Sequence, residues 1–123
     1  MNMSRKMGYE MTLENVSMHY GIDVETLLYY EKMGLFDDVS MKDGQKNWKA
    51  KDIEKLEVIV FLKSVDMPMN DIIQYLEYVE QGDHQAMGLL QKHRCVLMKK
   101  LHHDQKCVDQ LDCYIYQWKK SHQ

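Results

Sequence analysis

The last third of the chain carries a heptad repeat of apolar side chains. From Asp83 to the C-terminus the only helix breaker is Gly88. Alternating steps of three and four residues pick out ten positions, which we call the seam: Met87, Leu90, Arg94, Leu97, Leu101, Asp104, Val108, Leu111, Ile115 and Trp118. Eight of the ten are apolar. Such a stripe is too long and too narrow for a small globule to cover, so the pattern predicts a coiled coil of roughly 55 Å and therefore a dimer.

Two charged positions in the seam indicate how the two helices run. If Arg94 of one chain meets Asp104 of a second copy, the helices are antiparallel and Leu97 faces Leu101. Pairing these charges removes a penalty of several kcal/mol for burying each alone, whereas a parallel dimer would place Arg94 against its own copy. The hypothesis is therefore an antiparallel homodimer.

The remainder of the chain has the size of one small domain. The 123 residues, 45% of them hydrophobic, can bury one modest core and leave an extension that needs a partner. We expect a head over residues 9–80 and a coiled-coil dimerisation helix over residues 83–120.

Two short helices are predicted to open the head. Apolar spacing indicates a first helix over residues 12–19, and Gly21 ends it. Asp23 is placed to cap a second helix, in which apolar side chains recur at helical spacing until Gly34. Two helices joined by so short a turn predict a helix-turn-helix.

A β-hairpin wing is predicted next, over residues 37–50. This stretch is polar, Asp43 and Gly44 give a turn signal, and Trp48 is its one large apolar side chain. We expect Trp48 to anchor the wing in the core and not to stack on nucleic-acid bases.

Two further helices are predicted to complete the head. A third helix is expected over residues 51–65, where an apolar stripe recurs. Pro68 interrupts the chain, Asn70 is expected to cap a fourth helix, and Gly82 to end it. The fold class is thus mainly α: a winged helix-turn-helix head with a small hairpin, followed by a long C-terminal antiparallel coiled-coil helix.

Three neighbouring side chains of the second helix have different expected roles. Tyr29 and Tyr30 are adjacent, so they point in different directions, and we expect one in the core and one exposed. Leu28 is expected to enlarge the core between this helix and the wing.

Composition excludes several classes of protein. The N-terminus has no hydrophobic signal core and no apolar run is long enough to cross a bilayer, so we expect a cytoplasmic chain without a membrane partner. Three cysteines in no paired pattern fit free thiols. No Ser-His-Asp set, glycine-rich phosphate loop or paired carboxylates occur, so no enzyme activity is expected.

Evidence for a metal or other cofactor is slight, and none is expected. His103 and Cys107 are four residues apart on one helical face, as two metal ligands would be, but such pairs are common by chance. Cys95, Cys107 and Cys113 all fall outside the seam. His103 and Cys107 are the weak candidates for a metal site, and exposed residues without a ligand are the alternative.

The order of these elements resembles the MerR family of bacterial transcription regulators. Three stretches carry the resemblance: the helix-turn-helix "MTLENVSMHYGIDVETLLYYEKMGLF", the wing and following helix "GQKNWKAKDIEKL", and "FLKSVDMPMNDIIQYL", which matches a helix followed by G-x-S/P-L-x-E-I. With the C-terminal helix, the resemblance covers about residues 9–123.

The resemblance implies a homodimer that binds a pseudo-palindromic operator in double-stranded promoter DNA and distorts it, so that RNA polymerase can engage the promoter. The candidate DNA-binding residues are Thr12, Val24, Glu25, Tyr29, Lys42, Gln45, Lys46, Lys49 and Lys63. The lysines of the wing could equally be a solvated run.

The chain departs from the family pattern at phosphate contacts. Leu28 and Ser40 stand where the family has arginines, Gln45 replaces a tyrosine, and Glu25 adds a carboxylate to the second helix. Residues 1–75 also hold 9 Lys and Arg against 13 Asp and Glu. Because each lost phosphate contact removes about one released counterion, we expect weak binding. Binding that still depends on backbone contacts is salt-sensitive, and we expect the sequence to be read largely through DNA shape. The rival hypothesis is a dimeric protein-interaction module whose DNA binding is degenerate.

Overall fold

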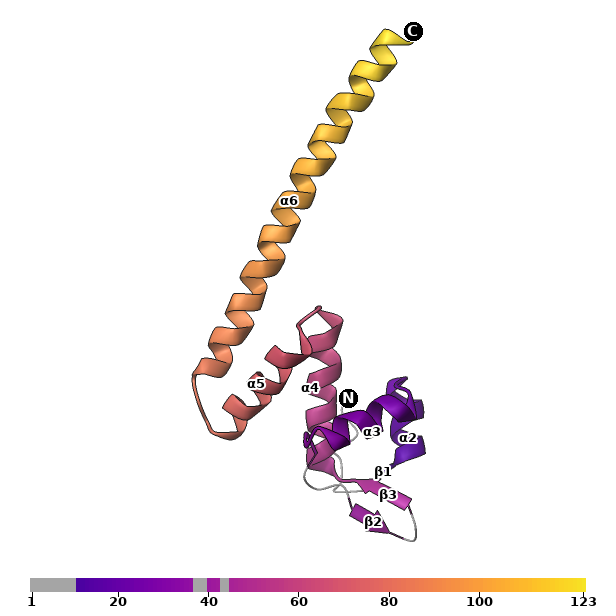
Figure 1. The fold of residues 1–123 in the computed structure, drawn as a ribbon, viewed down its shortest axis with the longest axis vertical. Coiled ribbons are helices and arrows are strands. Elements are labelled where there is room, and N and C mark those ends of the chain that lie inside the picture. Colours follow the sequence, from indigo (N-terminus) through magenta and orange to yellow (C-terminus); the bar gives the residue numbers. More distant parts are fainter. Residues whose placement is uncertain (1–10, 37–39, 43–44) are drawn as a thin grey trace. The chain divides into compact units, whose positions relative to one another are not determined.

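The computed structural model describes residues 11–36, 40–42 and 45–123, and it is mainly helical. The chain forms two compact units, Met1–Leu76 and Glu77–Gln123, which divide within a helix. The elements in chain order are β1 (Met11–Thr12), α2 (Leu13–Tyr20), α3 (Val24–Lys32), β2 (Ser40–Lys42), β3 (Gln45–Trp48), α4 (Ala50–Ser64), α5 (Met69–Glu80) and α6 (Gln85–Ser121), as Figure 1 shows.

The predicted helix-turn-helix is present as α2 and α3. The Thr12 side chain accepts a hydrogen bond from the backbone N–H of Asn15 at 3.2 Å and so caps α2. Gly21 ends α2 with φ of +64°, a left-handed conformation that favours glycine. Asp23 occupies the predicted N-cap position of α3, but its side chain makes no capping hydrogen bond, and its carbonyl accepts from the backbone N–H of Leu27 at 3.1 Å.

The wing belongs to a three-stranded antiparallel sheet in the order β1-β3-β2. Pairing of Lys42 with Gln45 and of Ser40 with Asn47 makes β2 and β3 a hairpin, as predicted. The third strand was not predicted: β1 is two residues long, and it pairs Met11 with Trp48. The sheet therefore connects the start of the helix-turn-helix to the wing.

The core of the first unit lies along α4. Ile53, Leu56, Ile59 and Leu62 recur at helical spacing on α4 and are all buried. Trp48 has no exposed surface, as its predicted anchoring role requires, and its ring meets that of Phe36 edge to face at 4.4 Å between centroids.

The turn between α4 and α5 contains a strained residue. Asp66 has φ of +64°, where a side chain is rarely tolerated. After it, the carbonyl of Pro68 accepts hydrogen bonds from the backbone N–H groups of Asp71 and Ile72, each at 3.0 Å. The expected cap at Asn70 was therefore wrong: α5 begins at Met69, and the carbonyl of Pro68 begins its hydrogen-bond ladder.

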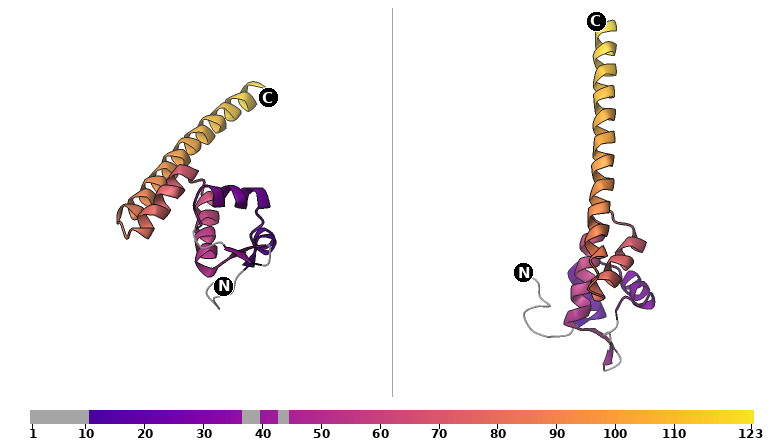
Figure 2. Two further views of the ribbon diagram at one scale, coloured as in Figure 1. Left: turned by 60° about the horizontal axis from the view of Figure 1, so that its bottom comes forward. Right: turned by 90° about the vertical axis from the view of Figure 1, so that its left-hand side faces the viewer.

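The second unit contains the end of α5, a turn and α6. Gly82, with φ of +68°, follows the end of α5 as predicted. The carboxylate of Asp83 then accepts from the backbone N–H of Gln85 at 2.9 Å where α6 starts. The helix α6 has 37 residues, and Figure 2 shows it as one continuous helix. In the part of the chain that the structure describes, no helix has both the length and the apolar character to cross a membrane.

Candidate nucleic-acid interface

The solvent-facing side of α3 is the part of the helix-turn-helix available to a partner. Glu25, Leu28, Tyr29 and Lys32 recur at the spacing of one helical face and are all exposed. Leu27, on the opposite face, is fully buried. We call these four exposed residues the α3 face.

Leu28 lies on the α3 face and not in the core. Its exposed fraction is 37%, so the expectation that it enlarges the core between α3 and the wing was wrong. The helical period decides this: Leu27 already occupies the buried face, and the next residue turns about 100° away from it.

The two adjacent tyrosines divide as predicted. Tyr29 is 59% exposed, whereas Tyr30 is 5% exposed, and their ring centroids are 6.4 Å apart. Burial raises the pKa of the Tyr30 hydroxyl above its ordinary value of 10.0, because the charged phenolate is poorly solvated there. Tyr29 therefore offers the exposed hydroxyl of this helix.

The hairpin carries three of the candidate residues. Lys42 is in β2, and Gln45 and Lys46 are in β3, with Met41 paired to Lys46 across the hairpin. The backbone thus puts these positions on one two-stranded ribbon, the shape that nucleic-acid-binding wings use. The side chains of Ser40, Lys42, Gln45 and Lys46 lie outside the described part of the structure.

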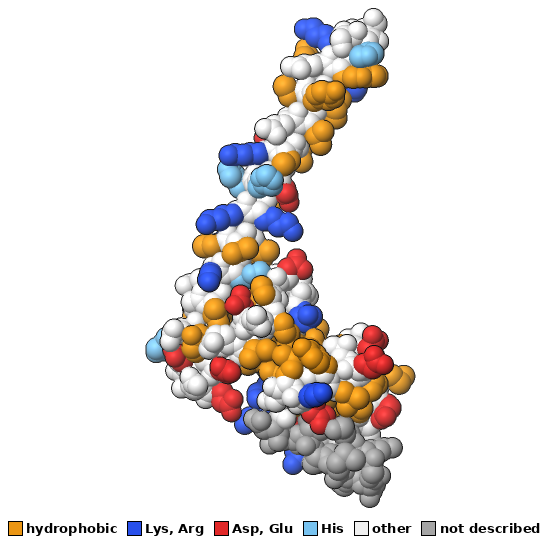
Figure 3. All heavy atoms as spheres, in the orientation of Figure 1, with side chains coloured by type: hydrophobic (Ala, Val, Ile, Leu, Met, Phe, Trp, Pro, Cys, Tyr) orange, Lys and Arg blue, Asp and Glu red, His pale blue; other side chains and the backbone are white. Residues whose placement is uncertain are grey.

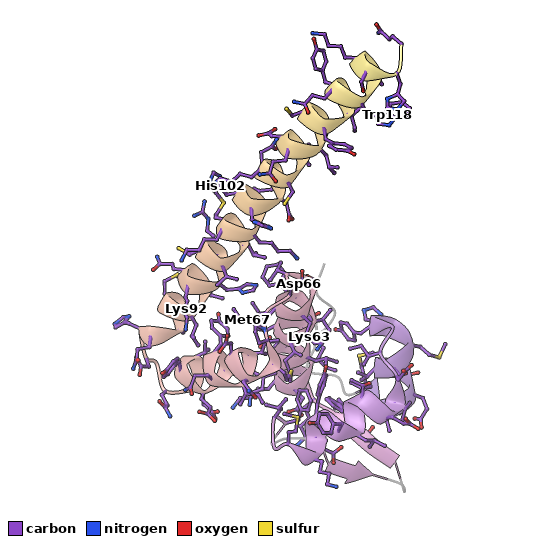
Figure 4. All side chains as sticks on the ribbon, turned by 45° about the horizontal axis from the view of Figure 1, so that its top comes forward. Lys63, Asp66, Met67, Lys92, His102 and Trp118 are labelled. Carbon is purple, nitrogen blue, oxygen red and sulfur yellow. The ribbon has the colours of Figure 1, made fainter. Side chains whose placement is uncertain are left out.

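Lys49 and Lys63 lie at the two ends of α4. Both are exposed. The backbone N–H of Lys49 donates to the buried carboxylate of Asp52 at 3.4 Å, which fixes the start of α4. Lys63 is labelled on α4 in Figure 4. It borders a pocket that Asp23 and Thr26, from the turn and from α3, also line.

Thr12 and Val24 are less available than the other candidates. Both are half-buried, and the Thr12 hydroxyl already caps α2. Of the nine candidate DNA-binding residues, the described structure therefore gathers Glu25 and Tyr29 on the α3 face and places Lys63 next to the first turn of α3.

Two side-chain bonds fix α4 to the helix-turn-helix. The hydroxyl of Tyr20 donates to the Glu57 carboxylate at 2.9 Å, and the ammonium of Lys55 donates to the Leu35 carbonyl at 3.1 Å. Sequence reasoning missed both bonds, because their partners are far apart along the chain and no local pattern indicates them.

The seam on α6 is largely uncovered in the second unit. Met87, Leu101, Val108, Leu111, Ile115 and Trp118 are exposed. Leu90 and Leu97 are partly covered, and the two charged members, Arg94 and Asp104, are exposed. Figure 3 shows apolar side chains along α6, interrupted in its middle by basic (Lys or Arg) and histidine side chains. Further exposed apolar residues lie outside the seam: Val96, Met98, Tyr114 and Tyr116.

The candidate metal pair forms a contact but not a site. The Cys107 thiol lies 3.5 Å from Nε2 of His103. Within the described ranges, no three side chains of His, Cys, Asp or Glu are grouped closely enough to hold a metal ion. Cys95, Cys107 and Cys113 are exposed free thiols.

Relatives of known structure share this fold. The crystal structure of HiNmlR, a MerR family regulator lacking the sensor domain and bound to promoter DNA, superposes with a TM-score of 0.66 at 23% identity over 82% of this chain and 80% of that one. A MerR family regulator from Listeria monocytogenes also gives 0.66, at 24% identity over 85% and 83%. The EcmrR-DNA complex in EcmrR-RPo gives 0.66 at 17% identity, over 89% of this chain and 40% of that one.

Sequence comparison assigns the family. The HTH-type transcriptional regulator AdhR of Bacillus subtilis (strain 168) is 30% identical over 74 residues, which are 59% of this chain and 53% of AdhR. The chain thus spans about half the length of that curated relative. The profile described as "MerR HTH family regulatory protein" matches residues 11–79, more than half of the chain. The chain therefore belongs to the MerR helix-turn-helix family of regulatory proteins.

Proposed function

We propose that this protein is a homodimeric transcription regulator that binds a pseudo-palindromic operator in promoter DNA. The observation that carries the proposal is the juxtaposition of an exposed α3 face, a hairpin wing and Lys63 in one small unit. A helix and a ribbon are the two shapes that enter the grooves of B-DNA. HiNmlR, which shares the fold, is bound to promoter DNA.

Dimerisation follows from the uncovered seam in this proposal. Six exposed apolar side chains on one stripe of α6 need a partner, and a second copy supplies an identical stripe. Setting Arg94 against Asp104 of the second copy fixes an antiparallel register. A symmetric dimer explains why the operator is expected to be pseudo-palindromic.

DNA deformation and RNA polymerase complete the proposed mechanism. The α3 face has one lysine, no arginine and one carboxylate, so it offers little direct readout of base edges. Specificity therefore comes largely from the cost of bending and twisting the operator, which depends on its sequence. A distorted promoter is then presented to RNA polymerase.

Substitution of Lys63 tests the DNA-binding proposal. Lys63→Ala removes one phosphate contact, so the slope of log affinity against log salt concentration should become shallower by about 0.9, and binding should weaken at every DNA sequence. The measurement is the fluorescence anisotropy of labelled DNA from upstream of the gene that encodes this chain, titrated with protein over a series of salt concentrations.

Lys99→Ala is the matched control, since Lys99 is an exposed lysine of α6 outside the seam. It should leave both affinity and salt slope unchanged. Wild-type protein that binds its upstream DNA no better than unrelated DNA at low salt would instead support the interaction-module hypothesis.

A further inference from the structure

A pocket opens between the helix-turn-helix and α4. It has a volume of about 380 Å³. Its walls are formed by side chains of α2, the turn, α3 and α4: Tyr20, Ile22, Thr26, Tyr30, Ile59 and Val60. The hydrogen bond from Tyr20 to Glu57 ties α2 to α4 beside it. Pockets of a few hundred Å³ with mostly apolar walls are the usual form of small-molecule sites.

One wall of this pocket carries the side chain of Tyr30. Tyr30 is 5% exposed, and among the described residues no group forms a hydrogen bond with its hydroxyl. The hydroxyl oxygen is not among the fully buried, unpaired side-chain atoms of the described residues, so it keeps contact with solvent, which a ligand acceptor can replace. Burial also raises the pKa of this hydroxyl, so it stays protonated and able to donate.

The charges at the rim do not select a charged ligand. Asp23 and Lys63 both border the pocket and are both exposed, and their charges are opposite. The walls include the apolar side chains of Ile22 and Val60, and no further charged side chain lines the pocket among the described residues. An ionic ligand would lose solvation against these walls without gaining a buried counter-charge.

We propose that this pocket is a binding site for small uncharged ring compounds that carry one hydrogen-bond acceptor, which the Tyr30 hydroxyl engages. The volume suits a compound of two fused rings, since about 150 Å³ is enough for benzene. The ring system packs against Ile22 and Val60, and the acceptor replaces solvent at Tyr30. This inference is independent of the proposed DNA binding.

The test is an NMR titration of the ¹⁵N-labelled full chain, without DNA, with three matched probes. 1-Indanone has the rings and a carbonyl acceptor, indane has the rings alone, and indane-1-carboxylate adds a charge. Indanone should bind saturably with a Kd below about 1 mM. The backbone amide signals of Ile22, Thr26 and Val60 should change their chemical shifts during the titration. Indane should bind more weakly, and the carboxylate most weakly.

Three variants separate the hydroxyl from the cavity. Tyr30→Phe should weaken indanone binding by about five- to tenfold and leave indane unchanged, because only a hydrogen bond is lost. Tyr29→Phe, at the exposed neighbouring tyrosine, should change neither the affinity for indanone nor the affinity for indane. Val60→Trp should fill the space and abolish binding of both, while the ¹⁵N spectrum of each variant reports whether it is folded.

Either of two results would overturn the proposal. One is a set of chemical-shift changes that does not saturate as indanone is added, or that extends over the residues of α6. The other is equal indanone affinity in wild type and in a folded Tyr30→Phe protein. Tighter binding of indane-1-carboxylate than of indanone would refute the uncharged class. Loss of DNA binding in the separate anisotropy assay would affect only the proposed function.

Discussion

At the scale of single residues, Leu28 limits how strongly the α3 face can attract a phosphate backbone. It is 37% exposed beside Tyr29, at the position where the resemblance implies an arginine. An exposed leucine contributes no charge, and counterion release is the main source of affinity in interfaces with DNA backbone.

Leu28→Arg is therefore expected to strengthen DNA binding. One added phosphate contact should steepen the salt slope by about 0.9 and raise affinity several-fold at low salt. Anisotropy titrations over a salt series measure both quantities. Leu28→Gln, which is polar but uncharged, should leave the slope at its wild-type value, and an unchanged slope in Leu28→Arg would show that this face does not meet phosphate.

Asp66 is the second informative residue. Its φ of +64° is a conformation in which a Cβ costs about 1–2 kcal/mol relative to glycine, with aspartate among the better tolerated residues. The family pattern has glycine here, so this chain keeps the left-handed turn without the residue best suited to it.

Two substitutions at Asp66 distinguish the turn from a helix. Asp66→Gly should give a free energy of unfolding about 1 kcal/mol higher than Asp66→Ala, as measured by urea denaturation. If residue 66 were helical, the order would be reversed by about the same amount, because alanine is the better helix former.

At the scale of elements, α6 carries the residues on which the proposed pairing depends. Its seam is apolar except at Arg94 and Asp104, and both charged side chains are exposed in the single chain. In a dimer each is stable only opposite the other, since a buried charge that loses its partner costs about 3–5 kcal/mol.

Charge reversal in the seam tests the register. Asp104→Lys alone should dissociate the dimer in sedimentation equilibrium, because the introduced ammonium group would then face Arg94 of the second copy. Adding Arg94→Glu should restore the dimer in the double variant. A double variant that remains monomeric would rule out the antiparallel register, and Lys99→Glu outside the seam should have no effect.

At the scale of the whole molecule, folding and association are expected to be coupled. The described part of the chain exposes an apolar stripe along a 37-residue helix, which would be costly to leave in water. A regulator that reads a symmetric operator also needs two heads.

Coupled association predicts that thermal stability depends on concentration. The Tm measured by circular dichroism should rise as the protein concentration is raised from low to high micromolar, because mass action favours the folded dimer. Sedimentation should give twice the 14.7 kDa mass of one chain. Leu111→Lys should lower the Tm and remove its concentration dependence; a wild-type Tm that is independent of concentration would argue against the dimer.

The sequence by itself determined the helices, the hairpin strands and the spacing of the seam, whereas the expected turn at Asp43 and Gly44 lies outside the described residues. Each depends on residues close together in the chain: the left-handed stop at Gly21, the buried stripe from Ile53 to Leu62, and the anchor at Trp48 were all predicted and are present. Local spacing suffices for these features because it fixes which side chains share a face.

Only the tertiary structure decided the remaining features. β1 is a two-residue strand that exists because β3 pairs with it, and the pocket at Tyr30 exists because α4 packs beside the helix-turn-helix. Leu28 is apolar by sequence, yet it is exposed because Leu27 occupies the buried face. These outcomes depend on contacts between distant segments, which no local periodicity encodes.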